Sequence, residues 1–240
     1  MDCIIRIANR NILIQGTSDF FCKACRGYLA DEGSEPEIRI RIDESMIRAE
    51  ATLHQENGET LSAKAAENVL VHRLIAEAML DRGAFLMHGA VIATGNEAYL
   101  FSARSGTGKT THMQKWLQND KNAYVVNGDK PLILIRPDGA YACGTPWCGK
   151  EHLGTNAVVR LRSIVFMQRS EDNRMETVSF RSALPMLLEQ IYQPADARHM
   201  KTTLALLSGL REHTTFYKFR FNNFRYDAFR VSYDILTNQD

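Results

Sequence analysis

Residues 103–111 read Ala-Arg-Ser-Gly-Thr-Gly-Lys-Thr-Thr, which contains the Gly-x-Gly-Lys-Thr order of a phosphate-binding loop. Successive backbone N–H groups of such a loop surround phosphate oxygens, and the helix that follows directs its positive end at them. The two glycines allow close approach and positive φ. Lys109 would bridge the outer phosphates of ATP and Thr110 would bind Mg²⁺. The expected nucleotide contacts are Ser105, Gly106, Thr107, Gly108, Lys109, Thr110 and Thr111.

The segments on both sides of this loop support the interpretation. The apolar run at residues 98–101 predicts a strand, and residues 112–117 predict a helix. Strand, loop and helix is the order that the motif requires. Ala103 stands where the motif has its first glycine. A glycine-rich turn with no ligand is the alternative.

Two further residues are candidates for catalysis. Asp129 follows an apolar strand predicted at residues 123–126. A carboxylate at such a strand end binds Mg²⁺ or accepts a proton from the attacking hydroxyl. The alternative is a turn residue, because Asn-Gly-Asp is favourable in turns. His88 lies in an apolar run that leads towards the loop, and is either catalytic or a core histidine.

A second glycine-flanked loop, residues 144–150, is a candidate for substrate contact. Lys150 would neutralise charge that develops on a transferred phosphoryl group, and Glu151 follows it directly. Arg104, inside the phosphate loop, faces either the nucleotide or solvent. The alternative for this loop is a structural connection packed on Trp147.

Composition limits the partners and the compartment. The chain has 240 residues, 45% of them apolar, and a net charge of +1, so no strong field favours nucleic acid. No apolar run reaches the roughly 18 residues of a membrane span, and no secretory signal starts the chain. The odd number of cysteines predicts reduced thiols and a cytoplasmic protein. A zinc site at Cys22 and Cys25, completed by Cys143 and Cys148, is a weaker alternative.

Hydrophobic patterning predicts an α/β chain with a mixed β-sheet core flanked by helices. Residues 1–62 are expected to form a small β-rich module, and residues 63–240 the nucleotide-binding core. Strands are predicted at residues 4–7, 12–14, 37–42, 85–93, 132–135, 141–143, 158–168 and 215–221. Helices are predicted at residues 63–82, 182–192, 196–210 and 227–236. The aromatic and polar alternation at 215–221 favours a strand with one buried face over a nucleic-acid-stacking surface.

Together, three motifs resemble those of the HPr kinase and ATP-dependent phosphoenolpyruvate carboxykinase superfamily. They are Met-His-Gly at 87–89, the loop at 105–111, and Gly-Asp at 128–129. The resemblance covers residues 85–170, and compact HPr-kinase-like proteins, including kinases that tailor lasso peptides, look most similar. It implies that Lys109 contacts the β- and γ-phosphates, that Thr110 and Asp129 hold Mg²⁺, and that His88 lies near the metal or the transferred phosphate.

Two positions depart from that family pattern. Lys130 replaces the second Asp of a Gly-Asp-Asp motif, and Ala103 replaces a glycine. The roles of metal ligand and proton acceptor would therefore converge on Asp129 or pass partly to Glu151. The glycine motif with which HPr kinases face their substrate is not recognisable, so phosphorylation of HPr itself is not supported.

The leading hypothesis is a Mg·ATP-dependent kinase that transfers the γ-phosphoryl group to a hydroxyl. The acceptor would be Ser or Thr of a peptide or protein, or a small metabolite. One alternative is a non-catalytic ATP-binding sensor or scaffold, and a carboxykinase-type lyase is a weaker one. Because HPr kinases assemble, the resemblance leaves a homo-oligomer open, and no interface can be read from the sequence.

Overall fold

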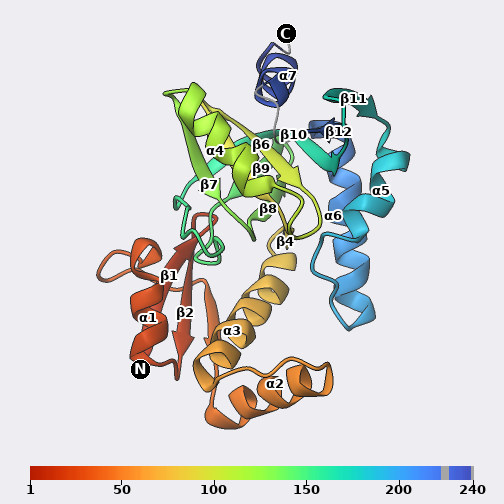
Figure 1. The fold of residues 1–240 in the computed structure, drawn as a ribbon. Coiled ribbons are helices and arrows are strands. Elements are labelled where there is room, and N and C mark those ends of the chain that lie inside the picture. Colours follow the sequence, from red (N-terminus) through yellow and green to blue (C-terminus); the bar gives the residue numbers. More distant parts are fainter. Residues whose placement is uncertain (223–226, 239–240) are drawn as a thin grey trace.

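The computed structural model describes residues 1–222 and 227–238, which form two β-sheets with helices packed on them (Figure 1). This architecture confirms the α/β class and the mixed β-sheet expected from the sequence. The smaller sheet comes from the first 41 residues, and the larger sheet carries the phosphate loop.

The small sheet begins with a tight hairpin of β1 (Asp2–Ile7) and β2 (Arg10–Gln15). Ala8 and Asn9 make its turn, both with positive φ. The third strand, β3 (Ile38–Arg41), pairs in parallel with β2. The strands were predicted, but the helices around them were not: α1 (Asp19–Ala24), η1 (Arg26–Tyr28) and α2 (Glu44–Glu56). The first 62 residues are therefore less β-rich than their sequence suggests.

Helix α3 (Ala63–Leu80) leads from the small sheet to the large one, as Figure 1 shows. Ser62 caps its N-terminus by accepting a hydrogen bond from the Ala65 N–H. Most of its buried side chains pack with the isoleucines of the small sheet, whereas Leu80 belongs to the core of the large one. Because α3 shares both cores, the division at residue 62 stays a prediction.

Within the described residues the large sheet has nine strands, in the order β4-β8-β9-β10-β6-β5-β7, with β12 beside β10 and β11 beside β12. Only the pairs β10–β6 and β10–β12 are parallel. The strands are β4 (Ala84–Leu86), β5 (Ala90–Thr94), β6 (Glu97–Ser102), β7 (Ala123–Asn127), β8 (Leu132–Arg136), β9 (Gly139–Cys143), β10 (Val158–Arg169), β11 (Arg174–Val178) and β12 (Thr215–Phe221).

The side chains of alternate residues on these strands pack into two separate hydrophobic cores, one on each face of the sheet. Helices α4 (Lys109–Asn119) and α7 (Asp227–Thr237) cover the face that carries Tyr99, Phe101 and Val165. Helices α5 (Phe180–Leu188) and α6 (Ala197–His213) cover the opposite face, with Leu100 and Ile164. This period of two is what a sheet covered on both faces requires.

The single strand predicted at residues 85–93 is wrong, because β4 ends at Leu86 and β5 begins at Ala90. His88 and Gly89 turn away from the sheet ladder, donating their N–H groups to the carbonyls of Gln190 and Asp129 at 2.7 and 2.8 Å. The helix predicted to run to residue 192 also ends early, because Tyr192 N–H donates to the Leu86 carbonyl.

All five cysteines are free thiols. In the part of the chain that the structure describes, no three histidine, cysteine or acidic side chains gather as a metal-binding group, so the zinc alternative gains no support. Over the same residues, no helix is both long enough and apolar enough to cross a bilayer.

Candidate functional site

The phosphate loop connects the end of β6 to the first residue of α4, as the motif requires. Gly106 and Gly108 have φ of +76° and +116°, a region that side chains rarely adopt. A Cβ at Gly106 would meet nothing within 4 Å. Conformation rather than lack of space therefore explains the glycine there.

Lys109 folds back across its own loop. Its ammonium donates to the Ala103 carbonyl at 2.7 Å. Alanine in place of glycine at position 103 therefore does not prevent the backbone carbonyl there from accepting this hydrogen bond. Burial lowers the pKa of Lys109, while the negative charge of Asp129 acts in the opposite direction. A phosphate in the loop would give this half-buried ammonium a better partner than a neutral carbonyl.

Asp129 and His88 are in hydrogen-bond contact, with Nε2 of His88 3.2 Å from Oδ1 of Asp129. The other ring nitrogen of His88 lies 3.0 Å from Oε1 of Gln190, which fixes the plane of the ring. Burial acts to raise the pKa of Asp129, but the hydrogen bond from His88 and the charges of Lys130, His88 and Lys109 outweigh it. The pKa of Asp129 is therefore lowered, and the group is a carboxylate.

A side-chain turn built on Asn127 presents Asp129. Its Oδ1 accepts hydrogen bonds from the N–H groups of Asp129 and Lys130 at 2.9 and 2.7 Å. Its amide donates to both oxygens of Thr145 at 3.0 Å. Gly128 is required here, since a Cβ would lie 2.5 Å from the Cys148 carbonyl oxygen. Asn-Gly-Asp is thus a turn, as one reading of the sequence held, and the turn holds Asp129 in the site.

A hollow of about 490 Å³, here called the phosphate hollow, brings most of the expected residues together. Gly149, with φ of +86°, lies beside both Asp129 and Glu151, so the 144–150 loop closes one wall. The predicted residues on this hollow are His88, Ser105, Gly106, Gly108, Lys109, Thr110, Thr111, Asp129, Lys150 and Glu151.

Two predicted residues lie elsewhere. Arg104 and Thr107 border a neighbouring hollow of about 590 Å³, the loop hollow, which is also lined by Phe166 and Met186. The Arg104 side chain is mostly exposed, and its guanidinium is 3.9 Å from the Glu189 carboxylate. Arg104 thus borders a different hollow from Asp129.

Arg169, which the sequence reasoning did not single out, bridges the two hollows. Its guanidinium donates to the carbonyls of Gly106 and Thr107 at 2.6 and 3.0 Å. It stands at the end of β10, the parallel neighbour of the strand that enters the loop. The signal in the sequence was an arginine directly after the strand predicted at residues 158–168, but the order of strands was needed to use it.

Comparisons with known proteins add little to this geometry. No family model matches the chain, and no curated protein matches it. Among solved structures, the chain is similar to an HPr(Ser) kinase/phosphatase from Coxiella burnetii, with a TM-score of 0.28 and 10% identity, over 53% of this chain and 88% of that one. At that TM-score the similarity carries no argument about function, which rests on the site itself.

Proposed function

We propose that this chain is a Mg·ATP-dependent phosphotransferase that moves the γ-phosphoryl group of ATP to a hydroxyl. One observation carries the proposal: the Asp129–His88 pair borders the same hollow as Lys109 and Thr110, at the N-terminus of α4. An anion-binding loop alone would support nucleotide binding. A carboxylate paired with histidine across from that loop adds a group that accepts a proton.

The residues present fit a magnesium ion that arrives with ATP. Mg²⁺ in such sites uses one or two protein oxygens besides phosphates and water. Thr110 and Asp129 offer a hydroxyl and a carboxylate on the one hollow. When bound, the metal supplies positive charge to the phosphate oxygens. Because Lys130 stands where a second carboxylate would be, Thr110 and Asp129 are the proposed protein ligands of the metal.

The transfer balances with groups that the chain holds. The acceptor oxygen forms a bond to the γ-phosphorus, the bond from that phosphorus to its bridging oxygen breaks, and ADP leaves. Asp129 accepts the hydroxyl proton, and His88 orients the carboxylate. Lys109 and Lys150, both on the hollow, oppose the charge on the transferred group.

Calorimetric titration of Mg·ATP, together with measurement of ADP formation, tests the proposal. Wild type is expected to bind Mg·ATP and to form ADP slowly with water as acceptor. Lys109→Met should weaken binding, whereas Asp129→Asn should lose turnover and keep most of the affinity. Binding without ADP formation under any condition would instead indicate a non-catalytic nucleotide sensor.

A further inference from the structure

A second hollow reaches the catalytic pair from another side. It measures about 470 Å³ and is here called the helix hollow, because α2 and α3 form much of its wall. Its lining includes His88, which also borders the phosphate hollow. A molecule in the helix hollow would therefore meet the ring that holds Asp129. If the proposed function holds, a molecule bound here lies beside the residue that orients the proton acceptor.

Apolar side chains make one surface of the helix hollow. They come from four separate segments, namely Leu53 on α2, Val69 on α3, Leu86 at the end of β4, and Ile191 after α5. Leu53 is 51% exposed, one of few large apolar side chains in the described chain left that open. A volume of this size lies within the roughly 300–1,000 Å³ of ligand sites.

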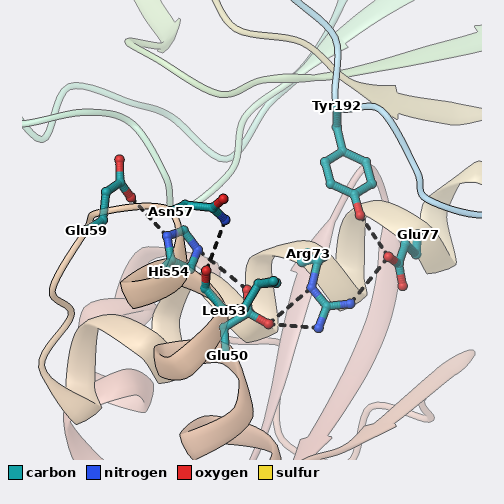
Figure 2. Close-up of polar contacts among 8 residues, drawn as sticks. All are labelled: Glu50, Leu53, His54, Asn57, Glu59, Arg73, Glu77 and Tyr192. Atoms are coloured by element: carbon teal, nitrogen blue, oxygen red, sulfur yellow. Dashed lines mark hydrogen bonds and ion pairs between the residues drawn. The ribbon is translucent and has the colours of Figure 1, made fainter.

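A network of polar contacts on α2 and α3 joins the charged groups at another part of the helix hollow (Figure 2). Arg73 donates to Glu50 at 2.8 and 3.2 Å and to Glu77 at 3.4 Å. The Tyr192 hydroxyl donates to Glu77 at 2.8 Å, and His54 lies between Glu50 and Glu59. The three carboxylates outnumber the guanidinium, so this part of the hollow is negatively charged and Arg73 is already paired.

Lys130 lines the same hollow without a carboxylate partner, whereas Glu189, which also lines it, is 3.9 Å from the Arg104 guanidinium. Within the described residues, no carboxylate lies within 4 Å of its ammonium, and the three hydrogen bonds of Lys130 are made by its backbone. Next to it, Nε2 of His72 is shut off from solvent with no hydrogen-bond partner. The His72 ring packs against Trp147, with ring centroids 4.4 Å apart and the planes tilted by 32°. Burial, with the charge of Lys130, lowers the pKa of His72 to about 3, so the ring is neutral.

We infer that the helix hollow receives a peptide segment whose Ser or Thr hydroxyl points at the His88–Asp129 pair. An acidic residue next to that Ser or Thr pairs with Lys130, and an apolar side chain farther along packs on Leu53 and Val69. An extended chain suits this layout, because successive side chains point to opposite sides and reach different walls. The charge complementarity comes from Lys130, the one lysine on this hollow.

Phosphate transfer from radiolabelled ATP to short synthetic peptides tests the inference. Each peptide has one central Ser, flanked by Asp, Asn or Lys and followed by Leu or Gly. Free serine and glycerol serve as small acceptors. The proteins are wild type, Leu53→Arg, Lys130→Gln, Met186→Arg in the loop hollow, and Leu204→Arg, whose exposed leucine lines none of the three hollows. Melting temperature and the Kd for Mg·ATP show that each variant is folded.

The expected wild-type result is labelling of the Asp-and-Leu peptide above its Asn and Lys versions. Leu53→Arg should lower kcat/KM for that peptide by about tenfold or more, and Leu204→Arg should not. Lys130→Gln should bring the ratio of rates for Asp over Asn peptides close to one, a ratio that does not depend on the variant's overall activity.

Three results would overturn the inference and leave the proposed function standing. They are turnover of Mg·ATP with no peptide labelled, labelling of small acceptors alone, and loss of peptide labelling in Met186→Arg but not in Leu53→Arg. Wild type that binds Mg·ATP without any turnover would overturn the proposed function, and the inference with it.

Discussion

Nε2 of His88 lies 3.2 Å from Oδ1 of Asp129, although the two residues belong to different strand connections. The backbone ties the same two segments together, since the Gly89 N–H donates to the Asp129 carbonyl at 2.8 Å. Contact through both main chain and side chain gives the carboxylate one orientation towards the phosphate hollow. The proposed chemistry depends on that orientation.

Asp129→Asn is expected to lower kcat by about 10² to 10⁴, the usual range for loss of a general base. The amide keeps the shape of the side chain but cannot accept the proton. Rates of ADP formation in both proteins, at saturating Mg·ATP, measure the effect. An unchanged kcat would show that Asp129 is not the proton acceptor.

The lowered pKa of Asp129 predicts a defined dependence of stability on acid. Because this pKa is lower in the folded protein than its ordinary value of 3.8, the carboxylate stabilises the fold above that value. The contribution is lost as the pH falls through the folded-state pKa. Urea unfolding of wild type and Asp129→Asn, from pH 6 to 3, should therefore show their free energies of unfolding converging at the acid end. A constant difference over that range would contradict the assignment.

Arg169→Met should raise KM for ATP by about tenfold. Hydrogen bonds from a charged donor contribute roughly 1.5–3 kcal/mol, and the exposure of the Arg169 side chain places its contribution at the lower end of that range. The substitution frees the carbonyls of Gly106 and Thr107 and loosens the phosphate loop. Arg162→Met is the matched control, because Arg162 lies on the same strand and pairs with Glu97. Equal kinetics in the two variants would deny Arg169 this role.

Gly128→Ala should impair catalysis through the position of Asp129. The new Cβ would lie 2.5 Å from the Cys148 carbonyl oxygen and 3.2 Å from that of Leu153, so the turn must shift. A misplacement near 1 Å costs about 10² in rate. Gly27→Ala is the control, because a Cβ there meets nothing within 4 Å. A Gly128→Ala enzyme with wild-type kcat would show that the turn does not need this packing.

Much of the large sheet was predictable because its strands are apolar runs bounded by turn residues. Helices α1 and α2 escaped prediction for a physical reason: each buries little of its surface, and α2 has Glu50 as its one fully buried side chain. The break at His88 escaped because it is produced by hydrogen bonds to Gln190 and Asp129, far along the chain.

The site residues also divide into those with a local sequence signature and those that depend on the fold. The loop and Asp129 have local signatures, a glycine spacing and a strand end, and both are visible in sequence. Arg169 and the helix hollow depend on which strands and helices become neighbours. Lys130 was noticed only as a departure from a family pattern, whereas its unpaired ammonium is a property of the folded chain.

A single-turnover experiment tests the central claim most directly. Excess wild-type protein is mixed with radiolabelled ATP and Mg²⁺, and labelled phosphate is followed on peptide and in water beside Asp129→Asn. Transfer of the γ-phosphoryl group by wild type, with both proteins binding Mg·ATP and Asp129→Asn at least about 10²-fold slower, is the predicted result. Bound Mg·ATP that stays intact in wild type would contradict the account.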